Sequence, residues 1–385
     1  MKIGPVPCAS VLLCLLLSQL AVAGDNPASQ ASAWTFAVSG DSRNCGNVVM
    51  PAIAAAAKRD GAAFYWHLGD YRAIYKFDED YLAEPNIPRD KDDPIITAYL
   101  SGAWDDFISH QLAPFKANDI PVYLGAGNHE MIFPKTHDEY LVKFAGYINT
   151  PELKAQRLKD NPLATSASYY RWSRGGVDFI NLDNSTKDSY DEAQLNWFFS
   201  VLLRDEGDES IHSIVVGMHE ALPDSLSAFH SMCGSTQGID TGRAVYRALV
   251  HAQQVKHKNV YVLSSHSHFY MNGVFNTPYW KNPANGGVVL PGWVVGTAGA
   301  VRYKLPPDLP QGTEASEHVY GYLSGTVTAE GTIAFAFHEL DERALQPARS
   351  QDYSEKFVAK CVQDNPPIKE MTWKDPGDPC KEKMP

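Results

Sequence analysis

The order of secondary-structure signals at the start of the chain most constrains its fold. Trp34 to Ser39 is a short β-rich run, Val48 to Lys58 is rich in alanine and typical of a helix, and Ala62 to Leu68 is again β-rich. Two parallel strands need a crossover between them, usually a helix, so a strand–helix–strand order favours a parallel βαβ unit. The opening of the chain therefore predicts an α/β fold.

The rest of the chain continues this alternation and adds antiparallel pairs. The segment 71–100 is charged and contains prolines, which is typical of an insertion. Both this segment and 301–316 are candidate loops at the rim of the site discussed below. No long Gly/Ser linker divides the pattern, so we expect one domain over 24–345 and a C-terminal tail over 346–385. Further helices are expected at 103–116, 192–203 and 241–255, strands at 120–124, 211–216, 260–263 and 292–296, and hairpins at 167–182 and 318–337.

The first 23 residues have the pattern of a secretory signal peptide. Lys2 gives the start a positive charge, an apolar core runs from Val11 to Leu17, and Ala21-Val22-Ala23 supplies the small residues of a cleavage site. The apolar core is too short to span a bilayer comfortably. We therefore predict an exported protein, periplasmic or secreted, with no membrane insertion after cleavage; the alternative is a retained N-terminal anchor.

Four cysteines remain after residues 1–23 are removed, and an even number in an exported protein favours two disulfides. Three pairings are possible. We favour Cys361 with Cys380, which would staple the tail, and Cys45 with Cys233, which would pin the rim of the site discussed below. The alternatives are four free, buried thiols, or a Cys45 thiolate that binds metal.

The acidic composition limits the partners. The formal net charge is −12 at pH 7, and no stretch of the chain gathers Lys and Arg into a cluster. Such a protein is poorly suited to bind nucleic acid or an anionic membrane. An anionic substrate would need a local source of positive charge, and bound metal ions can supply it.

Polar side chains follow the predicted strands at five places. Each place holds a carboxylate, an amide or an imidazole, and in open α/β sheets ligands bind at the carboxyl ends of strands. Oxygen and imidazole-nitrogen donors suit Zn, Mn or Fe rather than copper(I). The candidate metal ligands are Asp41, Asp70, Asn128, His219, His266 and His268, and His129 lies beside Asn128.

Taken in order, these positions resemble the motif series of the calcineurin-like metallophosphoesterase superfamily. The resemblance implies a four-layer α/β sandwich in which two mixed β-sheets are flanked by helices. It also implies a phosphomonoesterase or phosphodiesterase that acts on a small phosphorylated substrate through a metal-activated hydroxide, with one or two divalent ions (Mn, Zn or Fe) as cofactor. The matching motifs are Gly40-Asp41, Gly69-Asp70, Gly127-Asn128-His129-Glu130, His219 and Ser265-His266-Ser267-His268.

The resemblance also assigns roles by position. It implies that Asp70 bridges two ions about 3.5–4 Å apart, which together acidify a water and bind phosphoryl oxygens. It implies that His129 binds no metal and instead helps to protonate or stabilise the leaving oxygen. One ion site would be completed by Asn128, His219 and His266, and the other by Asp41 and His268.

Two positions depart from the family pattern. The first motif reads Gly40-Asp41-Ser42-Arg43, where the family has His in place of Arg43, and a guanidinium has no lone pair for a metal. Purple acid phosphatases, a related branch, use a Tyr three residues after the bridging Asp, but Ala73 occupies that position here. A tyrosinate–iron centre is therefore not expected, and Tyr71 and Tyr75 are interpreted as ordinary loop aromatics.

Three hypotheses follow for Arg43. We favour one bound metal, with Arg43 replacing the other cation and holding the phosphate in a bidentate fork, which makes Arg43 and His129 the predicted catalytic residues. Close behind is a two-metal site completed by water or by another ligand. In the third, Arg43 pairs with Asp41 or Asp70, and the protein is a catalytically inactive phosphate-ligand-binding protein of the same fold.

Overall fold

The computed structural model describes residues 1, 2, 4, 33–75, 77–81, 94–227, 230–345, 353–362 and 380. The chain divides into two units, Met1–Ala31 and Ser32–Pro385, and the second contains the fold. Nearly all of the predicted signal peptide, residues 1–23, lies outside the described residues. None of the helices described is both long and apolar enough to cross a membrane.

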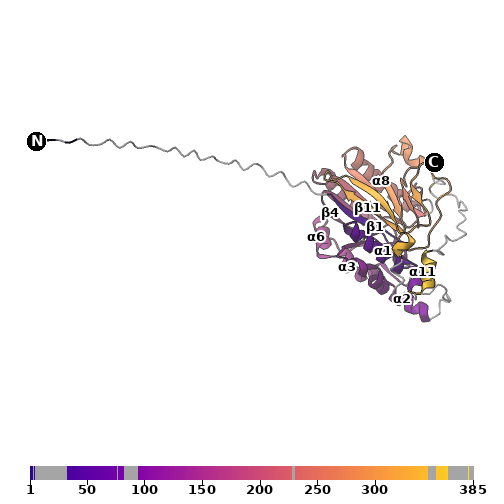
Figure 1. Cartoon of the computed structure of the whole chain (residues 1–385). Helices are drawn as coiled ribbons and strands as arrows, with labels where there is room; N and C mark the ends of the chain where they lie inside the picture. The colour runs from indigo at the N-terminus through magenta and orange to yellow at the C-terminus, as the bar shows by residue number, and fades with distance from the viewer. Residues whose placement is uncertain are drawn as a thin grey trace. The chain divides into compact units, whose positions relative to one another are not determined.

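Two mixed β-sheets form the centre of Ser32–Pro385 (Figure 1). Among the described residues the first sheet has five strands in the order β12-β11-β1-β2-β3, where β1 pairs in parallel with β2 and antiparallel with β11. This confirms the predicted βαβ opening and the predicted C-terminal hairpin. The strands are β1 (Trp34–Ser39), β2 (Ala62–His67), β3 (Val122–Leu124), β11 (Gly321–Val327) and β12 (Ile333–Glu339).

The second sheet has seven strands within the described chain, in the order β10-β8-β9-β7-β6-β5-β4. Its central strands β5, β6, β7 and β9 are parallel, and antiparallel strands flank them on both sides. The short strands β8 and β10 were not expected from the sequence. The strands are β4 (Tyr170–Arg174), β5 (Val177–Asn181), β6 (Ser213–Gly217), β7 (Asn259–Ser264), β8 (Tyr270–Asn272), β9 (Gly292–Val295) and β10 (Ala315–Ser316).

Helices cover the outer faces of the two sheets, which confirms the predicted four layers. Helix α1 packs on the first sheet through Val49 and Ile53, while α7 and α8 pack on the second through residues such as Phe198 and Leu249. Ser235 caps α8, which therefore begins at Thr236 and not at 241 as predicted. The helices are α1 (Gly46–Arg59), α2 (Pro94–Asp106), α3 (Ala113–Ala117), α4 (His137–Lys143), α5 (Ala145–Ile148), α6 (Pro151–Asp160), α7 (Glu192–Gly207), α8 (Thr236–Gln254), α9 (Pro278–Lys281), α10 (Glu342–Leu345) and α11 (Glu355–Val362).

Aromatic side chains hold the two sheets face to face. Phe36 and Phe64 of the first sheet stack with their ring centroids 5.3 Å apart, and Phe179 of the second sheet meets both rings edge-on at 5.1 Å. Trp172 stacks on Phe179 and on Tyr123. Edge-to-face and offset pairs of this kind contribute about 0.5–1.5 kcal/mol each beyond their buried area, so this layer fixes how the sheets are aligned.

Arg72, the arginine at the start of the insertion after Asp70, does not lie at the surface. Arg72 is fully buried and donates to Asp80 at 2.5 Å, to Asn47 of α1 at 2.6 Å and to Asp106 of α2. The predicted helix 103–116 is the C-terminal part of a longer helical path over 94–117, in which a π-helical turn at Phe107–Leu112 joins α2 to α3. Arg72 therefore anchors the loop after β2 to the helices behind it.

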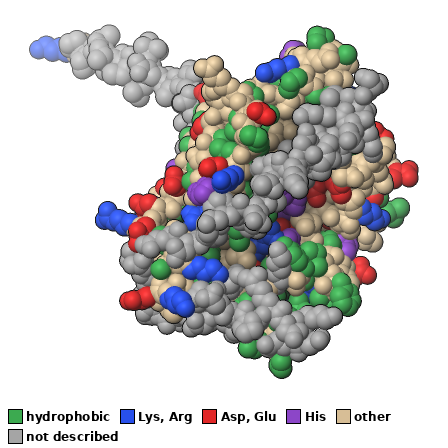
Figure 2. All heavy atoms as spheres, turned by 90° about the vertical axis from the view of Figure 1, so that its right-hand side faces the viewer, with side chains coloured by type: hydrophobic (Ala, Val, Ile, Leu, Met, Phe, Trp, Pro, Cys, Tyr) green, Lys and Arg blue, Asp and Glu red, His purple; other side chains and the backbone are tan. Residues whose placement is uncertain are grey.

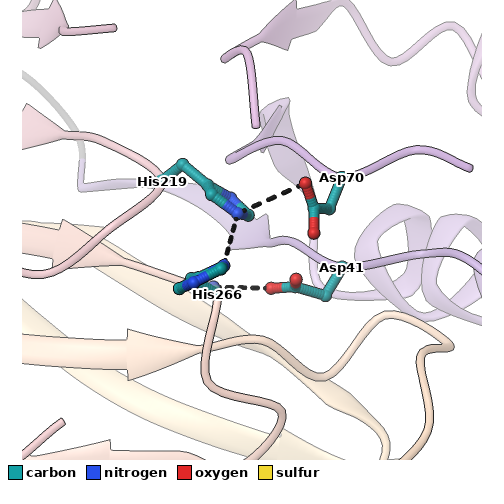
Figure 3. A group of neighbouring side chains, drawn as sticks. All are labelled: Asp41, Asp70, His219 and His266. Atoms are coloured by element: carbon teal, nitrogen blue, oxygen red, sulfur yellow. Dashed lines mark hydrogen bonds and ion pairs between the residues drawn. The ribbon is translucent and has the colours of Figure 1, made fainter. Parts of the chain in front are cut away.

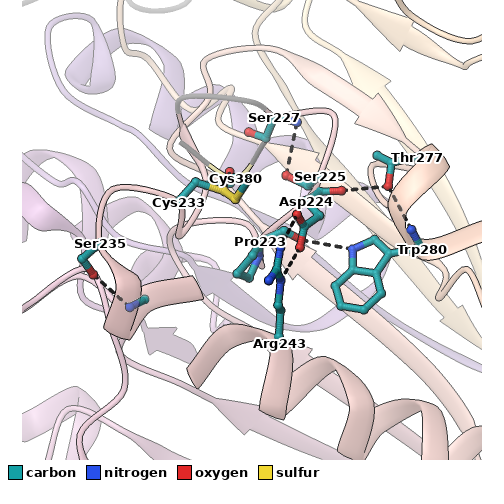
Figure 4. The surroundings of a disulfide bond; sticks show 12 residues. Pro223, Asp224, Ser225, Ser227, Cys233, Ser235, Arg243, Thr277, Trp280 and Cys380 are labelled. Atoms are coloured by element: carbon teal, nitrogen blue, oxygen red, sulfur yellow. Dashed lines mark hydrogen bonds and ion pairs between the residues drawn. A yellow bond between two sulfur atoms is a disulfide. The ribbon is translucent and has the colours of Figure 1, made fainter. Parts of the chain in front are cut away.

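The described residues contain two disulfides, but both predicted pairings are wrong. Cys45 pairs with Cys361 of α11, and Cys233 pairs with Cys380 (Figure 4). A Cys361–Cys380 bridge would have closed the tail on itself, whereas each observed bridge joins the tail to a loop of the main domain. Residues 363–379 between the two tail cysteines lie outside the described part of the chain.

A buried cluster of side chains from β4, β5, α6 and α7 contains more carboxyl groups than guanidinium groups. Arg171 donates to the Asp160 carboxylate from both Nε and Nη2, and its Nη1 lies 3.1 Å from Asp178 Oδ2 and 3.5 Å from Asp205 Oδ1. Burial and the neighbouring Asp178 raise the pKa of Asp205 to about 8. The folded protein therefore holds a proton on Asp205 at neutral pH that the unfolded chain, with an ordinary aspartate pKa of about 3.9, does not hold.

This cluster gives a prediction for stability against pH. Because the folded-state pKa of Asp205 is raised, its protonated form contributes stability that is present at low pH and lost as pH rises from about 4 to about 8. Asp205→Asn should flatten the fall in unfolding free energy over this range by up to about 1.4 kcal/mol per pH unit. Urea unfolding at several pH values measures it, with exposed Glu209→Gln as control; equal slopes in wild type and Asp205→Asn would contradict the prediction.

Candidate active site

Three tight turns at the carboxyl ends of parallel strands place the first polar side chains. Asp41 follows β1, Asp70 follows β2 and His266 follows β7, and their φ angles are +61°, +62° and +64°. A non-glycine residue in this left-handed region is uncommon and costs about 1–3 kcal/mol, and such residues concentrate at functional sites. Hydrogen bonds from the amides of Asp41 and Ser42 to the carbonyls of Gly69 and Asp70, each 3.0 Å, hold the first two turns against each other.

Side chains from both sheets meet at these turns (Figure 3). His219 Nε2 lies 3.3 Å from Asp70 Oδ1, 3.1 Å from Asn128 Oδ1 and 2.9 Å from His266 Nδ1. The backbone amide of His266 donates to Asp41 Oδ2 at 2.8 Å. One ligand atom from each of Asp41, Asp70, His219 and His266 lies within 4.8 Å of the others, and all four residues are buried or nearly so. The structure thus brings together the candidate ligands that the sequence placed on separate turns.

Backbone carbonyls orient three of the imidazoles. In each ring Nδ1 faces a carbonyl oxygen, so the ring donates from Nδ1 and turns Nε2 toward the site. Metal-binding histidines in proteins are oriented in the same way, because the outer hydrogen bond fixes the tautomer. The pairs are His219 with Leu68 at 2.9 Å, His129 with Ala73 at 2.5 Å and His268 with Val301 at 2.5 Å.

Arg43 lies on the other side of Asp70 from His219. Its Nη1 donates to Nε2 of His129, its Nη2 donates to Nε2 of His268 at 2.9 Å, and its Nε lies 3.9 Å from Asp70 Oδ2. His268 Nε2 also lies 3.3 Å from Asp41 Oδ1. The guanidinium therefore fills the space between His129 and His268, where the sequence left the choice between a metal, a guanidinium and an ion pair open.

The charges in the site are strongly coupled. Burial alone would raise the pKa of both carboxyls, but His268 holds the pKa of Asp41 below its usual range, and His129 with His219 holds that of Asp70 well below it. Burial would lower the pKa of His219, yet Asp70 raises it to about 10. The two carboxylates thus create a negative potential that stabilises positive charge beside His219.

The donor set fits a divalent cation. Asp41 Oδ1 and Asp70 Oδ2 are buried without a hydrogen-bond partner among the described residues, which native proteins seldom leave unexplained. Two carboxylates, an amide oxygen and two imidazoles match the ligands preferred by Zn, Mn or Fe. The residues that could hold such an ion are Asp41, Asp70, Asn128, His219 and His266.

Glu130 supports the loops of the site, a role that the sequence motif alone did not indicate. Its carboxylate accepts from the backbone amides of Asp70 at 2.8 Å, Tyr71 at 2.9 Å and Gly127 at 2.7 Å, and so joins the two loops that carry Asp70 and Asn128. Burial and the charge of Asp70 raise the pKa of Glu130 to about 8. Its place in the Gly-Asn-His-Glu quartet was the signal that could have found it.

Aromatic rings that sequence reasoning missed line the site. Tyr303 stacks on His268 with ring centroids 3.9 Å apart, and His230 lies 4.9 Å from the His266 ring and 5.2 Å from the Tyr303 ring. Tyr75, interpreted from the sequence as an ordinary loop aromatic, is 53% exposed, and its ring lies 5.0 Å from His129. No motif marked His230 or Tyr303, although Tyr303 falls in the candidate rim loop 301–316.

Comparison with known proteins decides the fold. No protein-family model and no curated protein matches the chain. Among solved structures, a purple acid phosphatase from yellow lupin (Lupinus luteus) seeds is similar over 90% of this chain, with 16% identity and a TM-score of 0.52. PhoD is similar over 81% of this chain and 70% of its own length, with 16% identity and a TM-score of 0.51. The chain has the calcineurin-like metallophosphoesterase fold. This chain spans 58% of the length of the lupin protein.

Gly127 gives a prediction for this metallophosphoesterase fold. A Cβ atom on Gly127 would collide with the Asp70 carboxylate and backbone amide, although its φ of −104° suits any residue. Gly127→Ala should therefore push the Asp70 and Asn128 loops apart and weaken Mn²⁺ or Zn²⁺ binding by about 10–100-fold, as for other residues that support metal ligands. Calorimetric titration with the metal measures the affinity. Gly146→Ala is the control, because a Cβ added there meets no atom within 4 Å. Unchanged metal affinity in Gly127→Ala would contradict the prediction.

Proposed function

We propose that this protein is an exported, metal-dependent phosphoester hydrolase, a phosphomonoesterase or phosphodiesterase acting on a small phosphorylated substrate. The observation that carries the proposal is the meeting of Asp41, Asp70, His219 and His266 within 4.8 Å, from turns on both sheets. The fold shared with a purple acid phosphatase supports the reaction class. The two disulfides support export, since such bonds persist outside the cytosol.

The proposed ion is held by the side chains that already face one another. Asp70, Asn128, His219 and His266 would bind it, with Asp41 beside them. A divalent ion in such a site lowers the pKa of water to near neutrality and polarises phosphoryl oxygens. The chain's own contribution is to fix the donors by the Leu68 carbonyl and by the left-handed turns, so that little reorganisation is needed on binding.

Arg43 and His129 are the proposed catalytic side chains. Arg43 presents a fixed cation that can take two phosphoryl oxygens in a fork. In hydrolysis a water oxygen bonds to phosphorus, the ester P–O bond breaks, and the leaving oxygen takes a proton. We assign the transfer of that proton to Nε2 of His129, while the attacking water releases a proton to solvent. Because the Ala73 carbonyl holds the proton on Nδ1, Nε2 must first take one up, which it can do once Arg43 turns from it to the phosphate.

A second candidate function rests on the contacts of Arg43. Its two Nη groups donate to Nε2 of both His129 and His268, which is the arrangement expected if the guanidinium closes the site. The protein would then be a catalytically inactive binder of phosphate-bearing ligands. Arg43 would contact the phosphate in both candidate functions, so only a measurement of phosphoester turnover distinguishes the hydrolase from the binding protein.

A small substrate, and not a nucleic acid, fits the surface charge. The formal net charge is −12, and acidic and basic side chains are interspersed over the described residues of the face shown in Figure 2. Nucleic-acid interfaces gather positive charge on one face. The positive groups that this site offers an anion, Arg43 and the proposed ion, lie inside it.

Hydrolysis tests the proposal directly. The protein should turn over 4-nitrophenyl phosphate or bis(4-nitrophenyl) phosphate, with stimulation by Mn²⁺ or Zn²⁺. His129→Ala should lower kcat by about 10²–10⁴-fold on an alkyl phosphate, since its oxygen needs a proton on leaving, and by less on a nitrophenyl ester.

The leaving-group comparison controls for general damage. A misfolded His129→Ala variant would lose activity equally on both esters, whereas loss of a proton donor is selective. The hydrolase proposal fails if no monoester or diester of a broad panel shows metal-stimulated turnover. If the protein then still binds inorganic phosphate, the second candidate function, a phosphate-ligand-binding protein, takes its place.

A further inference from the structure

The guanidinium of Arg43 lies among a second set of candidate metal ligands, next to the proposed ion site. Its Nη2 donates to His268 Nε2 at 2.9 Å, and its Nε lies 3.9 Å from Asp70 Oδ2. His268 Nε2 in turn lies 3.3 Å from Asp41 Oδ1. These three residues are the ones that the sequence resemblance assigned to a second ion. The cluster on the opposite side of Asp70, formed by Asn128, His219 and His266, is left to the first ion.

The contacts of Arg43 leave the second set without a free nitrogen lone pair. His268 donates from Nδ1 to the Val301 carbonyl and accepts at Nε2 from Arg43, so both ring nitrogens are engaged. A guanidinium keeps its charge in proteins and has no acceptor atom. Its positive charge also repels a second cation placed next to it, and the buried site weakens that repulsion little.

The loop that carries Arg43 is fixed on several sides. The amide of Ser42 donates to the Asp70 carbonyl at 3.0 Å, and the amide of Asn44 donates to Asp78 Oδ1 at 2.7 Å. The backbone amide of Cys45 donates to the Gly299 carbonyl at 3.0 Å, and the Cys45 sulfur forms a disulfide with Cys361. The Arg43 side chain is only 9% exposed. The guanidinium therefore belongs to the interior of the site.

We propose that Arg43 replaces a second metal ion, so that the protein binds one divalent cation and uses the guanidinium as the fixed second cation of the site. The inference rests on the proposed function for the first ion. One divalent ion and one guanidinium outweigh the charges of Asp41 and Asp70, and so leave a net positive site for an anionic ester. Nε of Arg43 makes no hydrogen bond within the described part of the chain and lies 3.9 Å from Asp70 Oδ2.

Metal stoichiometry tests the proposal without reference to activity. Wild-type protein loaded with Mn²⁺ or Zn²⁺ should contain one tightly bound equivalent by elemental analysis. Arg43→His removes the guanidinium and supplies an imidazole, and should raise the content to two. With manganese, electron paramagnetic resonance should show an isolated ion in wild type and a coupled pair in Arg43→His.

Each outcome decides between the two proposals. Two tight equivalents in wild type, or one in a folded Arg43→His variant, would overturn the replacement of a metal by Arg43 and leave the hydrolase intact. No bound ion in wild type would overturn the proposed function as well. If Arg43→His does not fold, as judged by thermal unfolding, the wild-type stoichiometry alone decides.

Binding of inorganic phosphate gives a second readout. Arg43→Met keeps the length of the side chain but removes the charge and the donors, and should weaken phosphate binding to the metal-loaded protein by about 10–100-fold, as expected for loss of charge-assisted hydrogen bonds. Arg43→Lys keeps the charge without the fork and should fall between the two. Equal phosphate affinity in wild type and Arg43→Met would show that the guanidinium does not face the ligand.

Discussion

The Asp70 carboxylate is the interaction on which the site depends. It lies in a left-handed turn after β2 of the first sheet, accepts from the backbone amide of His129 at 3.0 Å, and meets His219 from the second sheet at 3.3 Å. Burying it would be costly, but the surrounding imidazoles and Arg43 keep it ionised. The two sheets are therefore joined at this edge by charge, while the aromatic layer between them aligns the rest of their faces.

The sequence was sufficient for the parts that depend on local pattern. Parallel strands of one sheet bring their carboxyl ends to one edge, so the residues after β1 and β2 were expected to lie near one another. That the residue after β7 joins them depends on how the second sheet packs against the first. Helices α4 and α5 were missed because they are short, although Thr136 and Glu139 form a capping box that could have indicated α4. Helix α6 has ten residues, and Thr150 as its cap with Pro151 at its first position was a signal that could have found it. The disulfide pairing, the stacking of Tyr303 on His268 and the position of His230 depend on how distant segments pack, and one sequence carries no local signal for such contacts.

Comparison with other buried arginines shows the setting of Arg43. The Nη groups of Arg72 reach Asp80 and Asp106, and Arg171 binds Asp160, so each of these cations is neutralised by carboxylates at hydrogen-bond distance. Arg43 instead donates to imidazole nitrogens and stays 3.9 Å from its nearest carboxylate. Arg157 also donates to neutral acceptors, so the feature that sets Arg43 apart is its place among the candidate ligands, where an anion can replace its neutral acceptors.

The bond between Cys45 and Cys361 links the chemistry of the site to the redox state of the protein. Cys45 lies two residues after Arg43, and its partner belongs to α11, 316 residues further along the chain. The loop that orients Arg43 is therefore restrained by a segment far away in sequence, and this restraint persists only in an oxidising environment. A reducing environment would release α11 from the loop and remove one of the contacts that place the guanidinium.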